Sequence, residues 1–150
     1  MEAKDKDLSE LQYGQKLYGL THFIIGASRN YQRPVSRAEY SWIYDYFENN
    51  IDTIIDRAKP EIIAEVGIAF LLAGENDHPV IEKTRQAVTE SYNKKLNMIP
   101  STSGDDDLNH GEHRNVLAIM LLTRPDRLYP GPDLKASRQY QNFWLRNYLP

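Results

Sequence analysis

Three strongly apolar stretches, each with polar residues near its beginning, constrain the fold of this chain most. They lie at residues 20–27, 62–74 and 112–122 and are separated by amphipathic segments. The stretches recur with a spacing of 43 residues from His22 to Glu65 and 48 residues from Glu65 to His113. This recurrence predicts an all-α fold of repeated helix pairs, in which an apolar helix alternates with an amphipathic one.

The first pair is predicted at residues 8–29 and from about residue 40 onward. Glycines at positions 14, 19 and 26 weaken the helix propensity of the first segment. Ser36 followed by Glu39 matches a capping box directly ahead of the second helix. From Tyr40 to Ile55, apolar residues then repeat at intervals of three and four, which is typical of an amphipathic helix.

Proline marks the starts of the next two helices. Pro60 and Pro79 suit the first turn of a helix, where a missing amide hydrogen has no effect, and they predict helices over 60–74 and 79–96. Gly74 is the residue type that closes a helix in the left-handed conformation. The short connection at 75–78 predicts antiparallel packing of this pair.

The last pair is predicted at 111–122 and 133–148, joined by a proline-rich turn at 124–132. A long connection at 97–109 precedes it. Alternation of apolar and polar residues does not persist anywhere, so no strand is predicted. We therefore expect about six helices in three antiparallel hairpins.

The first, third and fifth predicted helices are apolar around most of their circumference, whereas the others are one-sided. This predicts inner apolar helices and outer amphipathic helices. The alternation resembles the helical-hairpin toroids, the α/α barrel superfamily that includes glycosidases, polysaccharide lyases, terpenoid cyclases and lanthionine cyclases. The resemblance covers architecture and no sequence motif, and it implies a partial α/α toroid. The chain is also similar to an uncharacterised bacterial helical family, which implies no activity.

Composition narrows the possible functions. A chain of 150 residues fits a single domain, which can still be part of a larger protein. The net charge of −3 and the lack of a basic run make nucleic acid an unexpected partner. Without cysteine, any metal ligands must be His, Asp or Glu. No apolar run is long enough for a bilayer, so the expected location is cytoplasmic, or exported if a leader is removed.

If the apolar helices run parallel, their N-terminal ends share one face, near the positive ends of the helix dipoles. His22, Glu65 and His113 would then converge there. Two imidazoles and one carboxylate can hold a divalent metal, zinc or iron, while leaving a position for water.

A second possible metal site uses His110 and His113, which share a helix face, with Asp107 or Glu112 as the carboxylate. The connection at 97–109 would bring Asp107 to the same end of the bundle. In the metal version, bound water is the nucleophile and Glu112 or Asp107 handles the proton.

Glu65 is the most informative single residue, because it interrupts an apolar segment and a buried carboxylate needs a partner. That partner is a metal, Arg114 or His22, and a pair with His22 would permit proton transfer. A structural ion pair or hydrogen bond explains the same residue without any function.

Two functional hypotheses follow. The first is a small hydrolase or lyase, metal-assisted or acid–base, with a small-molecule, carbohydrate or peptide-like substrate. The second is a helical-repeat binding or scaffold module without catalytic activity. Three hairpins leave the outer sides of the first and last pairs uncovered, which would favour a protein partner or a homo-oligomer.

Overall fold

The computed structural model describes residues 4–104 and 106–123. They form a short 3-10 helix, Asp5–Asp7, followed by five α-helices, and no β-strand occurs in these two ranges apart from an isolated bridge between Asn93 and Met98. The helices are α1 (Glu10–Ala27), α2 (Ser41–Arg57), α3 (Pro60–Leu72), α4 (Pro79–Glu90) and α5 (Leu108–Thr123). The all-α prediction is confirmed. The predicted turn at 124–132 and helix at 133–148 lie outside the described residues.

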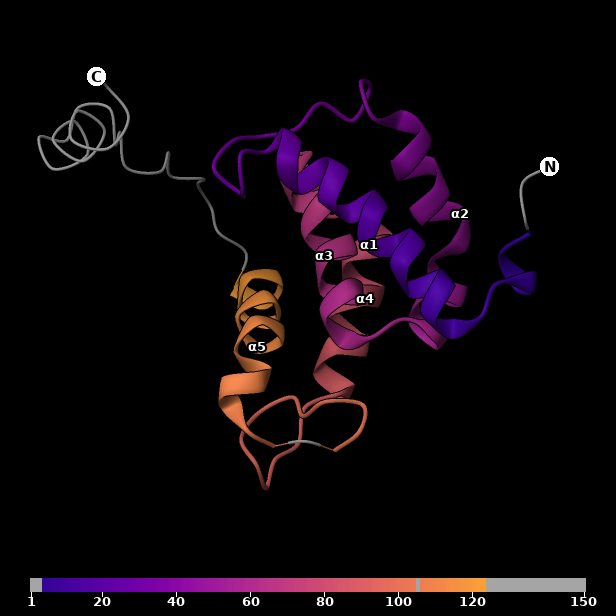
Figure 1. Cartoon of the computed structure of the whole chain (residues 1–150). Coiled ribbons are helices and arrows are strands. Elements are labelled where there is room, and N and C mark those ends of the chain that lie inside the picture. Colours follow the sequence, from indigo (N-terminus) through magenta and orange to yellow (C-terminus); the bar gives the residue numbers. More distant parts are fainter. Residues whose placement is uncertain (1–3, 105, 124–150) are drawn as a thin grey trace, which may run out of the picture.

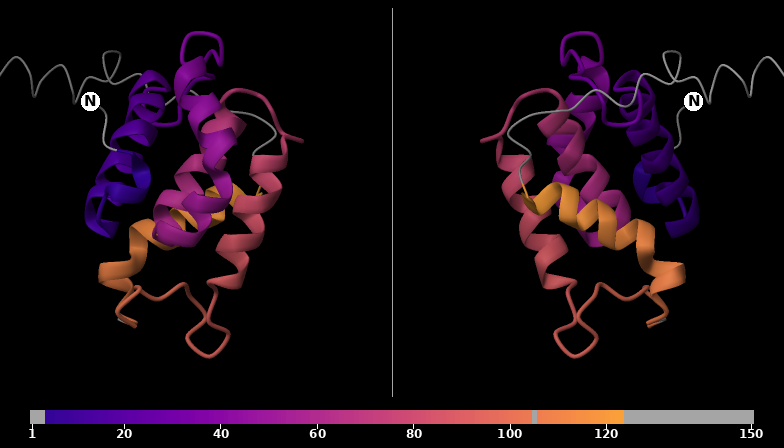
Figure 2. Two further views of the ribbon diagram at one scale, coloured as in Figure 1. Left: turned by 90° about the vertical axis from the view of Figure 1, so that its right-hand side faces the viewer. Right: turned by 90° about the vertical axis from the view of Figure 1, so that its left-hand side faces the viewer.

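Helices α1, α3 and α5 run toward the same end of the molecule, and α2 and α4 return in the opposite direction (Figure 1). Contacts between α3 and α5 agree with this parallel direction, since Glu61 meets Arg114 and, later in both helices, Gly67 lies closely against Leu121. Figure 2 shows that α5 crosses the other helices obliquely. The middle of α3 therefore packs against both α1 and α5.

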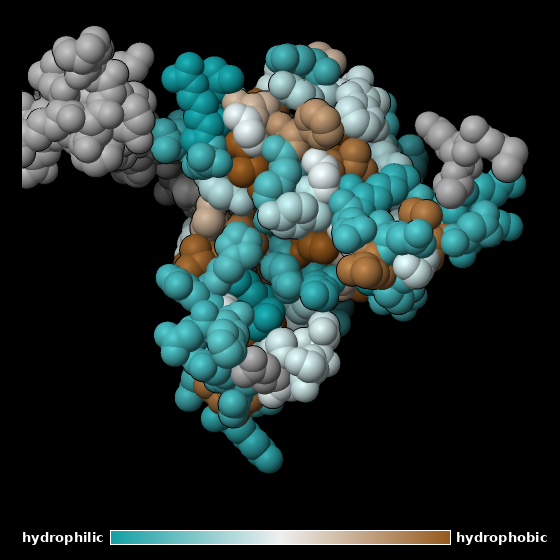
Figure 3. All heavy atoms as spheres, in the orientation of Figure 1, coloured by the Kyte–Doolittle hydropathy of each residue, from teal (hydrophilic) through white to brown (hydrophobic). Residues whose placement is uncertain are grey.

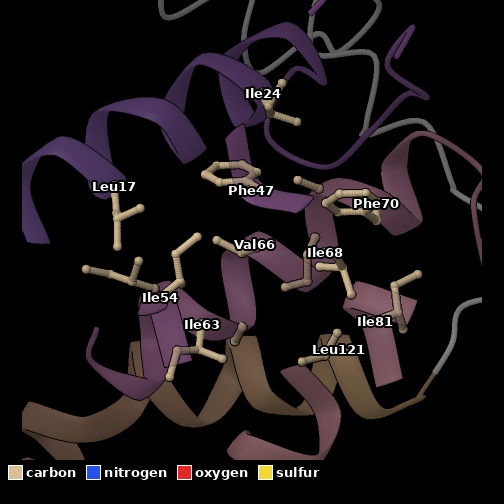
Figure 4. Close-up of a cluster of buried hydrophobic side chains, with 14 of the residues drawn as sticks. Leu17, Ile24, Phe47, Ile54, Ile63, Val66, Ile68, Phe70, Ile81 and Leu121 are labelled. Carbon is tan, nitrogen blue, oxygen red and sulfur yellow. The ribbon is translucent and has the colours of Figure 1, made fainter. Parts of the chain in front are cut away.

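Helix α3 is the centre of the core, as its apolar sequence predicts. Ten of its 13 residues are buried. Figure 4 shows Val66, Ile68 and Phe70 of this helix among apolar side chains from the four other helices. Such complete enclosure places any polar side chain of α3 in a desolvated environment unless a cavity reaches it.

The expected enclosure of the other apolar helices is wrong for α1 and α5. Leu11 and Phe23 of α1, and Val116 and Ile119 of α5, are exposed. Helix α1 packs against α3 and α2, and α5 packs against α3 and α4, but no described element covers their other side. Apolar patches accordingly lie among polar side chains on the face shown in Figure 3.

The capping box lies at a different helix from the one predicted. Ser9 and Gln12 form it at the start of α1, where the Ser9 hydroxyl accepts from the Gln12 amide at 3.3 Å and the Gln12 side chain accepts from the Ser9 amide at 2.9 Å. The predicted box at Ser36 and Glu39 is wrong, since turn residues 37–40 precede α2. The Val35 amide donates to the Leu72 carbonyl, which fixes the chain against α3 just before this turn.

Helix α4 ends at Glu90, six residues earlier than predicted. Asn93 explains the early end, because its side-chain oxygen accepts hydrogen bonds from the amides of Lys95 and Leu96 and forms a tight turn. By contrast, α3 ends at Leu72, close to the predicted bound, and Gly74 follows the C-cap residue Ala73 with φ +79°, the left-handed conformation predicted for it.

The connection before α5 is held to the bundle and is not a free loop. Ile99 is buried, its amide donates to the Asn115 side chain at 2.9 Å, and its carbonyl accepts from the same side chain at 3.1 Å. Helix α5 begins at Leu108, three residues earlier than predicted. Asn115 thus fixes the connection to the helix that carries His113.

Candidate functional site

The structure brings together the three residues that the sequence pattern singled out. Glu65 lies near the middle of α3 with 2% of its side chain exposed. The Thr21 hydroxyl donates to its Oε2 at 2.6 Å, and His22 Nδ1 is 3.9 Å from the same oxygen. From the other side, His113 Nε2 is 3.8 Å from Glu65 Oε1. One buried carboxyl group therefore lies between two imidazoles from α1 and α5.

The prediction that these residues meet at the N-terminal ends of the helices is wrong. Thr21 and His22 lie in the C-terminal half of α1, and Glu65 and His113 lie within α3 and α5, beyond the first turn of each helix. The field of a helix end falls off within one turn. The site therefore depends on the side-by-side packing of three helices and not on their N-terminal dipoles.

His22 is oriented by its own helix. Its Nδ1 is 2.8 Å from the Tyr18 carbonyl oxygen, and its ring stacks on Tyr18 with 3.7 Å between the ring centroids. A carbonyl oxygen only accepts, so Nδ1 carries the hydrogen in this contact. The lone pair that a metal would need is therefore not available at Nδ1, the His22 nitrogen near Glu65.

Burial raises the pKa of Glu65 above its ordinary value of 4.5. The Thr21 hydrogen bond and the nearby His22 and His113 lower it, but burial outweighs them, and the charge of Glu61 raises it further. Glu65 therefore keeps its proton to a higher pH than an accessible glutamate does.

A cavity of about 770 Å³ lies beside Glu65, within the size range of small-molecule sites. It is lined by parts of α1, α3 and α5 and by the end of α2. Thr102, from the connection at 97–109, also lines it, as expected of a loop that reaches the site. The site residues on its wall are Glu61, Glu65 and His113, with Tyr18 beside them.

Glu61 was missed by the sequence analysis, although it precedes Glu65 by one helical turn. Residues four apart share a helix face, and this spacing was the available signal. Arg114 Nε is 3.3 Å from Glu61 Oε2, and Arg114 Nη1 donates to the Ile99 carbonyl at 3.1 Å. Arg114, one of the partners predicted for Glu65, thus pairs with Glu61.

The family model for a domain of unknown function (DUF3541) matches residues 1–146. The chain belongs to this DUF3541 family. No curated protein and no solved structure matches it. The family description assigns no activity, so the function of this DUF3541 chain has to be argued from its own geometry.

The remaining predicted site residues lie away from the cavity. His110 Nδ1 is 4.0 Å from Asp107 Oδ2, and Asp107 also accepts from the Asn109 amide at 2.9 Å. His110 and Glu112 are exposed. No contact in the described part of the chain joins Asp107, His110 or Glu112 to Glu65, so the catalytic and metal-binding roles predicted for them gain no support.

Across residues 4–104 and 106–123, no three His, Asp or Glu side chains are arranged to hold a metal ion. The zinc or iron site stays a prediction. Among the same residues, no helix is both long enough and apolar enough to cross a membrane.

Proposed function

We propose that this DUF3541 chain is an enzyme that uses the Glu65 carboxyl group for acid–base hydrolysis or elimination. The substrate is a carbohydrate or peptide-like molecule bound in the adjacent cavity. One observation carries the proposal: a buried carboxyl with a raised pKa lies on the wall of a large cavity, with an imidazole on either side. Perturbed titratable groups in a cavity are typical of catalytic sites.

In this proposal Glu65 is the general acid. Thr21 holds Oε2, so Oε1 is the oxygen that exchanges the proton with the substrate. His113 lies 3.8 Å from Oε1 and has 71% of its side chain exposed, so it connects the buried carboxyl to solvent. After each turnover the imidazole returns a proton to Glu65. Such proton transfer contributes roughly 10²–10⁴-fold to a rate.

We base the proposal on acid–base chemistry because the contacts favour it over a metal centre. His22 Nδ1 is committed to the Tyr18 carbonyl, and Glu65 Oε2 is committed to Thr21. The alternative is a metal-assisted enzyme with zinc or iron at the site, and elemental analysis of protein purified without a His tag would test it.

The finer architecture belongs to the same proposal. Helices α1, α3 and α5 run in one direction and α2 and α4 return in the other, which supports a partial α/α toroid of helical hairpins. A sixth helix at residues 133–148 would complete the third hairpin.

The test is turnover by the full chain on a panel of glycosides, uronic-acid polysaccharides and short peptides. Glu65→Gln keeps the shape of the side chain and removes the titrating group, and we expect it to lower kcat by about 10²–10⁴-fold. Glu82→Gln, an exposed change on α4, is the matched control and leaves kcat unchanged. Equal activity of wild type and Glu65→Gln, or no turnover of any class, would contradict the proposal.

A binding or scaffold module is the second proposal, and a different observation favours it. Phe23 and Trp42 meet edge to face at 6.2 Å between ring centroids, although 60% and 57% of these residues are exposed. Large exposed aromatics prefer a protein partner or a second copy of the chain. The mass in solution tests the homo-oligomer, since Phe23→Ser with Trp42→Ser would convert a dimer to a monomer.

A further inference from the structure

The cavity contains a second carboxylate that the proposed function does not yet use. Glu61 and Glu65 are four residues apart on α3, and both line the cavity. Side chains at this spacing lie on one face of a helix with their Cβ atoms about 5–6 Å apart. Two carboxyl groups are thus presented to the same space by one rigid element.

Their surroundings are opposite in character. Glu65 is 2% exposed, and its neighbours are the Thr21 hydroxyl and two imidazoles. Glu61 is 23% exposed, and its Oε2 faces the Arg114 guanidinium at 3.3 Å. Arg114 is itself held by the Ile99 carbonyl, which fixes the guanidinium beside Glu61. Glu61 thus has a cationic partner at short distance, whereas the desolvation of Glu65 favours the protonated form of that carboxyl.

We propose that Glu61 is the second catalytic residue of the site, and that the pair hydrolyses a glycosidic bond. This rests on the proposed function of Glu65. Glu61 takes a proton from a water molecule, whose oxygen forms a bond to the anomeric carbon. The bond from that carbon to the leaving oxygen breaks with its electron pair, and the leaving oxygen takes the proton of Glu65. The proton on Glu61 then passes to solvent, and Glu65 is reloaded through His113.

The separate partners of the two carboxyl groups favour a glycoside over a peptide. Two carboxylates that attack a peptide bond through one water share a single proton between them. Here each carboxyl has its own partner, Arg114 for Glu61 and Thr21 for Glu65, so one can act as base and the other as acid. Glycosidases use this division of roles across the scissile bond.

Other charged residues line the cavity with this pair, on α1, at the end of α2, in the connection to α3 and on α5. They are Glu10, Asp56, Arg57, Lys59 and His113. Arg57 is paired with Glu10 at 3.0 Å.

The test compares leaving groups, with 2,4-dinitrophenyl glycosides and the corresponding methylumbelliferyl glycosides as probes on the full chain. A dinitrophenolate leaves without protonation, so Glu65→Gln loses about 10²–10⁴-fold on methylumbelliferyl glycosides and much less on dinitrophenyl glycosides. Glu61→Ala loses a similar factor on both probes, because both need the attacking water.

A purely structural role of Glu61 is distinguished by chemical rescue. Sodium formate fits the space that Glu61→Ala leaves and replaces the base, so kcat of this variant rises about tenfold or more, whereas formate leaves Glu65→Gln unchanged. Thermal unfolding of Glu61→Ala checks that the variant is folded.

The outcomes separate the two proposals. If Glu65→Gln abolishes turnover while Glu61→Ala matches wild type, or if only peptides are cleaved, the carboxylate pair is overturned and the proposed function stands. If Glu65→Gln is fully active on both probes, the proposed function fails. Loss in Glu61→Ala without any rescue by formate also overturns the pair.

Discussion

Gly67→Ala is the sharpest test of the packing that places the site. Gly67 lies two residues after Glu65, where α3 contacts both α4 and α5. A Cβ atom there would lie 2.3 Å from Thr84 Oγ1 and 2.6 Å from Leu121 Cδ1, whereas ordinary contacts begin at 3.4 Å. Thr84 is held in place, because its hydroxyl donates to the carbonyls of Val80 and Ile81. The end of the Leu121 side chain can rotate away, but Thr84, and α4 with it, would have to move by about 1 Å.

The magnitude follows from two opposing effects. Overpacking of a core costs about 1–3 kcal/mol, and the lack of space at two buried neighbours places this site at the upper end. Replacing glycine by alanine within a helix returns about 0.5–1 kcal/mol. We expect a net loss of about 2 kcal/mol in the free energy of unfolding, equivalent to about 4–8 °C in Tm for a chain of this size.

Urea unfolding followed by circular dichroism measures this loss. Gly19→Ala is the matched control, because Gly19 is also helical but has no neighbouring atom within 4 Å of an added Cβ, and we expect it to gain about 0.5–1 kcal/mol. In a Thr84→Ala background the cost of Gly67→Ala should fall by about 1 kcal/mol or more. A Gly67→Ala variant as stable as the control would refute the close packing of α3 against α4 and α5.

Three further predictions concern the site and its supports. Thr21→Val removes the hydroxyl that donates to Glu65, so it lowers stability by about 1–3 kcal/mol in urea titration and raises the pKa of Glu65 further; unchanged stability would contradict this. Asn115→Ala removes the acceptor of the Ile99 amide and leaves the Ile99 carbonyl bonded to Arg114 alone, so hydrogen exchange at the Ile99 amide accelerates, and an unchanged rate counts against the anchor. Native Glu65 keeps a proton that the unfolded chain releases, so the free energy of unfolding of wild type falls relative to that of Glu65→Gln as pH rises from 4.5 to the raised pKa. Above the raised pKa the difference between the two proteins is constant. A difference that is constant over the whole pH range would be evidence against burial of Glu65.

The fold was predictable where local chemistry determines it. Pro60 and Pro79 begin helices as expected, and the uninterrupted apolar run of α3 identified the core helix. Helix ends were less predictable, because they depend on side chains such as Asn93 that bond their own backbone in competition with the helix. The exposed faces of α1 and α5 could not be inferred from apolar content alone, which does not show how many neighbours a helix has.

The sequence predicted which residues form the site, but not the hydrogen-bond and ion-pair partners of its two carboxyl groups. Glu65 was identifiable because a carboxylate in an apolar run must be satisfied, and the repeat spacing related it to His22 and His113. Thr21 as the hydrogen-bond donor and Arg114 as the partner of Glu61 depend on how the helices are rotated about their axes. Sequence periodicity does not fix that rotation to the few ångströms that separate one pairing from another.

The central claim is that Glu65 is a buried carboxyl group between His22 and His113. The most direct measurement is an NMR titration of the carbon-13 signal of its carboxyl group, in wild type and in His113→Ala. The structure predicts a midpoint above 4.5 in wild type and a higher one in His113→Ala, because His113 lowers the pKa of Glu65. A wild-type midpoint at or below 4.5, with no change in His113→Ala, would contradict the account.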